Sequence, residues 1–212
     1  MKRRFCVFVL IGIAFCLSAQ QELPEYQFAS GSWEIDGERL YQRDAGSQLA
    51  KVNFRVSQSG SMIYEFNVRY EGGAADGHGG FGLHLYGDEA HPGASWGSGK
   101  SYLIWFNYDE HPRSLQIPAG FSMQLYRSLS HSRMELLESL DLNEYIRQLP
   151  RNFLAAPAPV RIIVFGDTGE IRVYEPGGAD RYFTFQADRR DIPLKGSWVT
   201  LRTNGITLSF GF

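Results

Sequence analysis

The sequence predicts an all-β protein, and three observations point to this class. Short segments that alternate apolar and polar residues recur along the chain, giving roughly a dozen expected strands. The 23 glycines and 9 prolines fall largely between these segments, where turns are expected. One short segment alone has a helical pattern. Because a sheet of this size needs its second face covered, we expect two stacked sheets, with a barrel as the other all-β architecture.

The first 19 residues have the three-part pattern of a secretory signal peptide. Met1–Arg4 is basic, Phe5–Leu17 is an almost unbroken apolar run, and the chain becomes small and polar from Ser18. The run of about 13 residues is shorter than the roughly 20 that span a bilayer as a helix. We therefore expect residues 1–19 to be cleaved, leaving residues 20–212 as one β-sandwich domain that does not span the membrane.

Both cysteines lie in this leader, at Cys6 and Cys16. Lipidation at Cys16 is the alternative to cleavage near Ala19, although Phe15 stands where lipoprotein signals have a small residue. Cleavage leaves 18 basic and 23 acidic residues, a net charge of -5 in place of -2, and no cysteine. This excludes disulfides and Cys-ligated zinc, and it offers no basic field for nucleic acid. We expect an exported protein, periplasmic, secreted or on the cell surface of a bacterial envelope.

Alternation is clearest in Met62–Tyr70, which places Tyr64, Phe66, Val68 and Tyr70 on one face. Two turns are predicted to close hairpins, Gly166–Gly169 and the Asn204-Gly205 pair. The continuous β-branched run at 160–165 indicates a strand buried on both faces. The remaining strands are expected at residues 48–56, 81–86, 102–108, 122–127, 170–174, 182–185, 198–202 and 206–210.

Residues 141–149 predict a short helix inserted between strands. Asp141 and Glu144 have the spacing of a capping box, and Pro150 ends the pattern. The apolar side chains of this segment are expected to pack on the sandwich, and they are Leu142, Tyr145, Ile146 and Leu149.

Four segments, taken in order, resemble the concanavalin A-like lectin/glucanase superfamily, including its laminin-G-type jelly rolls. They are Gly31–Gly37 with Leu40–Gln42, Tyr64–Arg69, Gly80–Leu85 with Tyr102–Trp105, and Asp167–Tyr174, and Gly196–Val199 then leads into the last strands. Each is weakly specific, and their order over nearly all of the mature chain carries the resemblance. It implies a two-sheet antiparallel jelly-roll sandwich whose first and last strands pair.

The competing architecture is an outer-membrane barrel, because Leu208–Phe212 alternates and ends in phenylalanine. A lipid-facing barrel alternates throughout, and both the continuous run at 160–165 and the predicted helix depart from that pattern. The sandwich is therefore the favoured prediction.

No known catalytic motif is recognised. Glucanases of this superfamily use a Glu-x-Asp-x-x-Glu strand, whereas Glu135, Glu138, Asp141 and Glu144 are spaced by three. The string Gly93–Gly97 has the letters of a serine-hydrolase elbow but lies in a glycine-rich loop, and no His-Glu-x-x-His zinc helix occurs. The sequence favours a protein without enzymatic activity, with a carbohydrate-active enzyme as a less favoured alternative.

In this superfamily sugars lie on the concave sheet or at its rim, stacked on aromatic side chains. The resemblance therefore implies ligand binding by Trp96, Tyr102, Trp105, Tyr108 and His84. Residues 72–99 hold 10 glycines and are expected to include an adaptable rim loop. Packing in a core is the alternative interpretation of these aromatic residues.

Calcium is the metal that the resemblance makes possible, because family members often hold it at a loop rim. Asp76, Asp88, Glu89 and Asp109 offer the oxygen ligands that calcium prefers, and exposed acidic loops are the alternative interpretation. The five histidines between residues 78 and 131 match no tight metal-binding spacing.

The function expected from these observations is an exported, non-catalytic binding module. Its partner would be a glycan or an envelope protein, recognised through the concave sheet or the glycine-rich rim. The alternative is a structural or assembly subunit of a periplasmic or cell-surface complex.

Overall fold

The computed structural model describes residues 23–73, 77–149, 156–175, 180–188, 190 and 192–211. The predicted signal peptide, Asp76 and Pro150 lie outside these residues. In the part of the chain that the structure describes, no helix combines the length and apolar character needed to cross a membrane.

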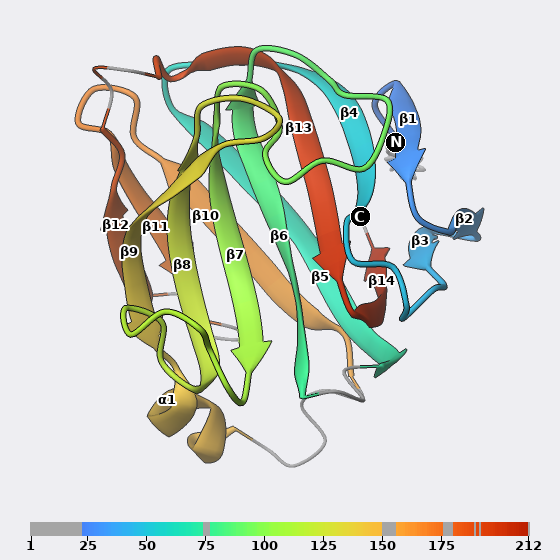
Figure 1. Ribbon diagram of the computed structural model, residues 1–212. Helices are drawn as coiled ribbons and strands as arrows, with labels where there is room; N and C mark the ends of the chain where they lie inside the picture. The colour runs from blue at the N-terminus through green and yellow to red at the C-terminus, as the bar shows by residue number, and fades with distance from the viewer. Residues whose placement is uncertain are drawn as a thin grey trace, which may run out of the picture.

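Two seven-stranded antiparallel sheets stack face to face (Figure 1). The front sheet has the order β1-β4-β13-β6-β7-β8-β9, and the back sheet has the order β12-β11-β10-β5-β14-β3-β2. This confirms the predicted two-sheet jelly-roll sandwich. The front strands are β1 (Tyr26–Ser30), β4 (Ala50–Ser59), β13 (Lys195–Asn204), β6 (His78–Gly87), β7 (Ser101–Asp109), β8 (Gly120–Ser128) and β9 (Met134–Asp141). The back strands are β12 (Tyr182–Gln186), β11 (Glu170–Tyr174), β10 (Ala158–Val164), β5 (Met62–Gly73), β14 (Ile206–Gly211), β3 (Arg39–Gln42) and β2 (Trp33–Asp36).

The core lies between the sheets, and its burial falls toward one end. Along β7, Tyr102 and Ile104 are fully buried, whereas Phe106 and Tyr108 on the same face are partly exposed. The same gradient runs along β6 from Leu85 to Phe81 and along β8 from Leu125 to Phe121. The sandwich is therefore closed tightly at one end and less tightly at the end where α1 (Asn143–Gln148) lies (Figure 1).

The predicted hairpin at Asn204-Gly205 is wrong, because β13 and β14 belong to different sheets. The chain crosses from the front sheet to the back sheet at Gly205, which has φ +63°. The last strand, β14, then pairs with β3 and β5, so it lies beside the opening segment Leu40–Gln42, whereas the first strand, β1, pairs with β4. The hairpin predicted at Gly166–Gly169 is confirmed, since β10 pairs with β11 across it.

The prediction of a fully buried strand at 160–165 is also wrong. Val160, Ile162 and Val164 face the core, whereas Arg161 is exposed and its Nε lies 3.0 Å from Glu65 Oε1 on β5. The strand therefore has one buried face and one outer face, and Arg161 lies on the outer face. A half-buried strand alternates in this way, whereas a strand covered on both faces is apolar throughout.

The short helix is confirmed, but its predicted capping box is not formed. Asp141 ends β9, and its Oδ1 accepts a hydrogen bond from Asn143 N at 2.8 Å. Leu142 occupies the N-cap position with no side-chain cap. The acidic run Glu135–Glu138 belongs to β9, a strand that the sequence pattern did not predict.

The sheet crossing at Gly205 yields a test of the fold. An L-residue in the left-handed backbone conformation costs roughly 1–2 kcal/mol. Gly205→Ala is expected to lower the free energy of unfolding by more than this amount. An added Cβ would lie 2.7 Å from His78 O, and overpacking adds about 1–3 kcal/mol. The measurement is the free energy of unfolding in urea.

Gly37→Ala is the matched control, because Gly37 has φ +60° but no atom within 4 Å of an added Cβ. Gly37→Ala should lower the free energy of unfolding only by the cost of the left-handed backbone conformation. Equal losses in the two variants would contradict a tight crossing at Gly205.

Candidate functional site: a groove on the outer face of the front sheet

Three rows of side chains cross the outer face of the front sheet. The strand register places Arg202 between Lys51 and Gly82, with Trp105 and Gln124 following in the same row. The rows on either side are Asn53, Thr200, His84, Leu103 and Tyr126, and Asn204, Gly80, Asn107 and Ser122. This face therefore carries polar, cationic and aromatic groups, whereas the opposite face of the same strands forms the core.

Two glycines of β6 decide how Trp105 lies. A Cβ added to Gly80 would stand 2.7 Å from the Trp105 ring, and one added to Gly82 would stand 2.9 Å from it. The indole thus lies flat over β6 in the space that these glycines leave open. Its Nε1 donates a hydrogen bond to Asn107 Oδ1 at 2.9 Å, which fixes the ring in the plane of the sheet.

The loop from Asp88 to Lys100, here called the Trp96 loop, folds over β13 and β4 (Figure 1). Lys51 Nζ donates to Gly97 O at 2.6 Å, Arg202 Nη1 donates to Trp96 O at 2.6 Å, and Asn53 Nδ2 donates to His91 O at 3.0 Å. Three side chains of the sheet thus satisfy carbonyl groups of the loop and hold it in place.

Trp96 is 50% exposed, although it is a large apolar residue. The Arg202 guanidinium lies 4.7 Å from the Trp96 ring and 5.1 Å from the Trp105 ring. Cation–π attraction of this kind favours a fixed indole position. Arg202 therefore supports one face of Trp96 from below while the indole remains accessible to solvent.

A groove of about 710 Å³ runs between the Trp96 loop and the loop that follows β7. Its floor includes Trp105, Asn107, Gln124, Tyr126 and Asn204. Tyr126 OH donates to Gln124 Oε1 at 2.7 Å, and Gln124 Nε2 donates to Ser122 Oγ at 2.8 Å. The groove thus has aromatic, amide and hydroxyl groups in its floor, although Trp105, Asn107, Gln124 and Asn204 are each no more than 8% exposed.

Lys51 and Arg202 are buried cations opposite each other on neighbouring strands, a pairing that costs stability. Among the described residues neither has a carboxylate within 4 Å. Burial, and then Arg202, lowers the pKa of Lys51 to about 7, and burial lowers the pKa of Arg202 to about 10. Arg202 Nε is buried without a hydrogen-bond partner among the described residues.

His84 faces the groove side of β6 but is only 1% exposed, beneath the Trp96 loop. Its Nδ1 lies 2.9 Å from Ser101 Oγ, which itself donates to Ser98 O. Nδ1 therefore carries the proton, and the buried Nε2 has no partner among the described residues. Burial, and then Lys51, lowers the pKa of His84 well below its usual range, so the ring is a neutral packing group rather than a groove residue.

The structure separates the aromatic residues that the sequence pattern grouped together. Trp96 and Trp105 line the groove. Tyr102 is fully buried between the sheets, with its OH donating to Ile192 O at 3.0 Å. Tyr108 also lies on the inner face of β7, and its OH donates to Glu110 at 2.6 Å. Residues 102, 105 and 108 cannot share one face, because side chains of a strand alternate.

Among the groove residues that were not predicted from the sequence are Asn107, Gln124, Tyr126, Arg202 and Asn204. A signal for two of them was present, because Thr200, Arg202 and Asn204 alternate with the apolar residues of β13. Polar positions that alternate with core residues mark the outer face of a half-buried strand. The alternation along β13 alone therefore predicts that Arg202 lies on the outer face of the sheet.

The carboxylates proposed for calcium do not converge. Asp88 Oδ1 accepts a hydrogen bond from Lys100 N, Glu89 pairs with His131 at 3.1 Å, and Asp109 Oδ1 accepts from His111 N. Among the described residues no three His, Cys, Asp or Glu come together as a metal would require. Asp76 lies outside the described residues, so a calcium site at these positions stays a prediction.

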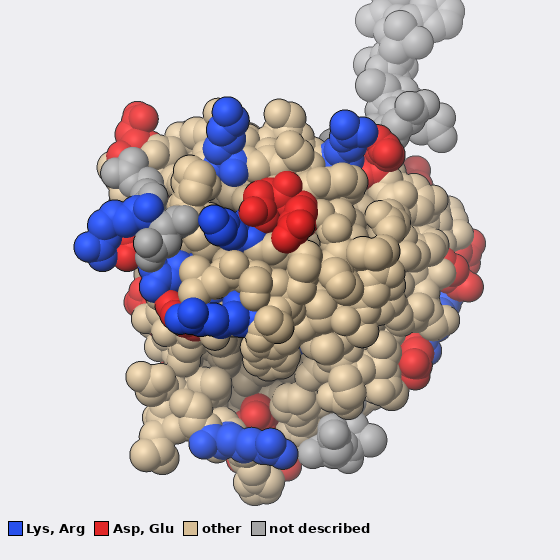
Figure 2. Space-filling model, turned by 45° about the horizontal axis from the view of Figure 1, so that its top comes forward, with Lys and Arg blue, Asp and Glu red and all other residues tan. Residues whose placement is uncertain are grey.

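Several charged side chains on the rest of the surface form ion pairs. In Figure 2, many of the Lys and Arg side chains lie on the left of the face shown, with acidic side chains beside several of them, and a mostly uncharged area lies to the right of centre. Arg127 and Arg133 on the β8–β9 side both pair with Glu135 at distances of 2.7 and 2.8 Å. Lys51 and Arg202 differ from these two arginines, because they have no carboxylate partner among the described residues.

The fold matches several solved structures at low sequence identity. A carbohydrate-binding module, CBM66, from Bacillus subtilis aligns with a TM-score of 0.57 and 12% identity, covering 89% of this chain and 93% of that one. The exoplasmic/lumenal domain of VIP36, in a form bound to calcium and mannose, aligns with a TM-score of 0.55 and 9% identity, covering 88% and 81%. The fold is the concanavalin A-like jelly roll. The CBM2 module of the evolved Dit of Lactobacillus casei BL23 phage J-1 also matches, with a TM-score of 0.52, 13% identity and coverage of 89% and 80%.

The concanavalin A-like fold of this chain is supported by structure alone. No family model matches the sequence, and no curated protein matches it. The groove lies on the outer face of the front sheet of that fold, with Trp96 projecting from a loop above it.

The buried Lys51 predicts a pH dependence of stability. Its pKa is about 7 in the folded protein and 10.5 for an unperturbed lysine, so the unfolded state binds more protons between these values. The cost of burying this group therefore falls as the pH rises from 7 toward 10. Between pH 7 and pH 10, the free energy of unfolding of the wild type should therefore rise by a few kcal/mol more than that of Lys51→Met. Each unit of pKa difference corresponds to about 1.4 kcal/mol.

Urea denaturation at several pH values measures this difference. Lys195→Met, at an exposed position, controls for the loss of one positive charge. Parallel curves for wild type and Lys51→Met would show that Lys51 does not titrate in this range.

Proposed function

We propose that this chain is an exported, non-catalytic module that binds a glycan in the groove of the front sheet. The observation that carries the proposal is the exposed Trp96 indole, held over Arg202 at the edge of a groove with a polar floor. An exposed, immobilised aromatic ring beside oriented polar groups is the arrangement of a binding site.

Trp96 supplies a stacking platform for one sugar ring. The face of an indole carries negative quadrupole charge, and the C–H groups on one face of a pyranose carry positive partial charge. Since Arg202 and the loop carbonyls fix the indole, little side-chain entropy is lost when a sugar packs on it. This favours recognition of a flat, equatorially substituted sugar face.

The floor of the groove supplies hydrogen bonds to sugar hydroxyl groups. The amide of Asn204 makes no hydrogen bond to another described residue, and Asn107 uses only its Oδ1 toward Trp105. Amide groups both donate and accept, as hydroxyl groups do, so the two kinds of group are complementary. Discrimination between sugars would come from these positions rather than from Trp96.

Two further observations support binding without hydrolysis. Among the structural neighbours, CBM66 is a carbohydrate-binding module and the VIP36 domain is in a mannose-bound form. In this chain, Asp109 is the one carboxylate among the described residues that line the groove, whereas glycoside hydrolysis ordinarily uses a pair.

A glycan array with the purified protein, read with and without added calcium, tests the proposal. We expect binding to a restricted set of glycans that Trp96→Ala weakens at least about tenfold, as loss of a central aromatic contact does. Titration calorimetry with the best glycan from the array then measures the affinity of each variant.

Tyr182→Ala is the matched control, because Tyr182 is 41% exposed but lies on β12 of the back sheet. This variant should keep wild-type affinity. Binding to no glycan, or equal weakening in both variants, would contradict the groove as a glycan site. Binding that disappears on chelation would show that calcium participates.

A further inference from the structure

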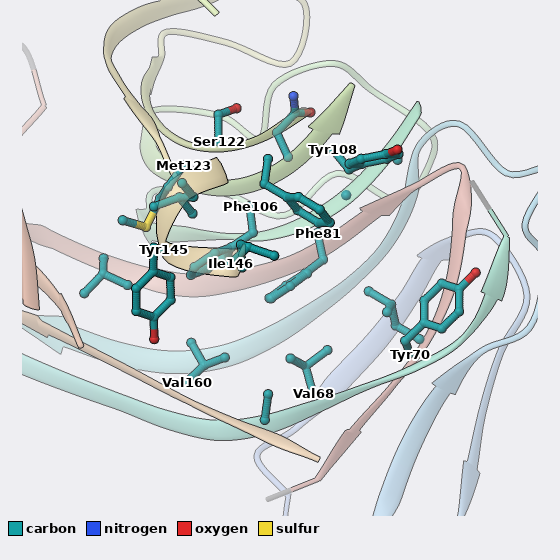
Figure 3. Close-up of a pocket in the computed structure, with 18 of the residues that line it drawn as sticks. Val68, Tyr70, Phe81, Phe106, Tyr108, Ser122, Met123, Tyr145, Ile146 and Val160 are labelled. Carbon is teal, nitrogen blue, oxygen red and sulfur yellow. The ribbon is translucent and has the colours of Figure 1, made fainter. Parts of the chain in front are cut away.

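A second cavity lies between the two sheets, on the opposite side of the front sheet from the groove. It has a volume of about 180 Å³. Figure 3 shows Phe81, Phe106 and Met123 facing Val68 and Val160 across this space. Tyr145 and Ile146 of α1 lie at one side of the same space.

The cavity occupies the end where inner side chains are incompletely covered. Phe81, Phe106 and Phe121 point toward the core yet remain partly exposed, whereas their counterparts at the other end are fully buried. Ala158 is the inner residue of β10 at this end of the sandwich. The next inner residues along β10, Val160 and Ile162, are larger. The small side chain leaves space that a larger residue would fill.

The lining offers almost nothing to a polar ligand. The described residues around the cavity include no Lys, Arg, His, Asp or Glu. Three polar side chains of the lining make hydrogen bonds elsewhere in the protein: Tyr108 OH donates to Glu110, Tyr70 OH donates to Gly73 O, and Asn107 Oδ1 accepts from Trp105. A sugar or an ion placed here would lose its hydration without replacement.

We propose that this cavity is a binding site for a compact, uncharged hydrocarbon group, either a single aromatic ring or the end of a short acyl chain. A cavity of about 150 Å³ lined by aliphatic and aromatic residues stays dry and binds benzene, and this one is of similar size and lining. Tyr70, which is 38% exposed, lies at its edge, so a polar head group can remain in solvent.

The site is separate from the groove except at Asn107, which lines both. Phe81, Phe106 and Tyr108 contribute to the cavity from the inner face of β6 and β7, whereas Trp105 contributes to the groove from the outer face. Failure of the glycan proposal would therefore leave this one intact, and the reverse is also true.

The experiment uses toluene as the ring probe and octanoate as the acyl-chain probe. Either probe should raise the melting temperature, because a ligand that binds only the folded state stabilises it. It should also shift the methyl NMR signals of Val68, Met123 and Val160, with little change at Leu103 on the outer face. A response to toluene alone identifies a ring site, and a response to octanoate identifies a chain site.

Ala158→Leu should fill the cavity and abolish both responses, while glycan binding in the groove is retained. Ala119→Leu makes the same change at an exposed position and should respond as wild type does. Ile206→Phe fills the cavity from β14 and replaces Ala158→Leu if that variant does not fold. The proposal is overturned if neither probe acts on wild type, or if the filled variants respond as strongly as wild type.

Discussion

Alternation of side chains along β6 and β7 is the constraint on which both sites depend. Each strand sends successive residues to opposite faces, so Phe81 and Phe106 enter the core while Gly82 and Trp105 face outward. A shift of one residue in this register would place the tryptophan in the core and the phenylalanines in the groove. The groove and the cavity therefore share two strands but no aromatic ring.

The glycines of β6 have opposite effects on stability and on function. Glycine in the interior of a strand weakens it, because it adds chain entropy and packs no side chain. At Gly80 and Gly82 this cost is offset by the Trp105 indole, which occupies the space above them. The result is a flat aromatic floor in the middle of the sheet, which a row of larger side chains on β6 would not permit.

The sequence predicted the fold class and most strands because period-two alternation depends on local pattern alone. It failed at Asn204-Gly205, since the same dipeptide suits a two-residue hairpin and a crossing between sheets, and only tertiary packing distinguishes them. For the site, alternation would have separated Trp105 from Tyr102 and Tyr108, but the prediction grouped the three together. The association of Arg202 with Trp96 was not accessible, because it joins a strand to a loop 106 positions away.

The buried cations beneath the Trp96 loop link stability to the proposed binding role. Burying two like charges without a carboxylate partner costs free energy, so Lys51 and Arg202 are a poor choice for folding alone. What they provide is geometry: each donates to a neighbouring carbonyl of the loop, at Gly97 and at Trp96. Apolar residues would leave Trp96 O without the Arg202 donor and Gly97 O with Ser95 Oγ alone, and the indole would lose its support. The arrangement is therefore better explained by the position of Trp96 than by the stability of the sandwich.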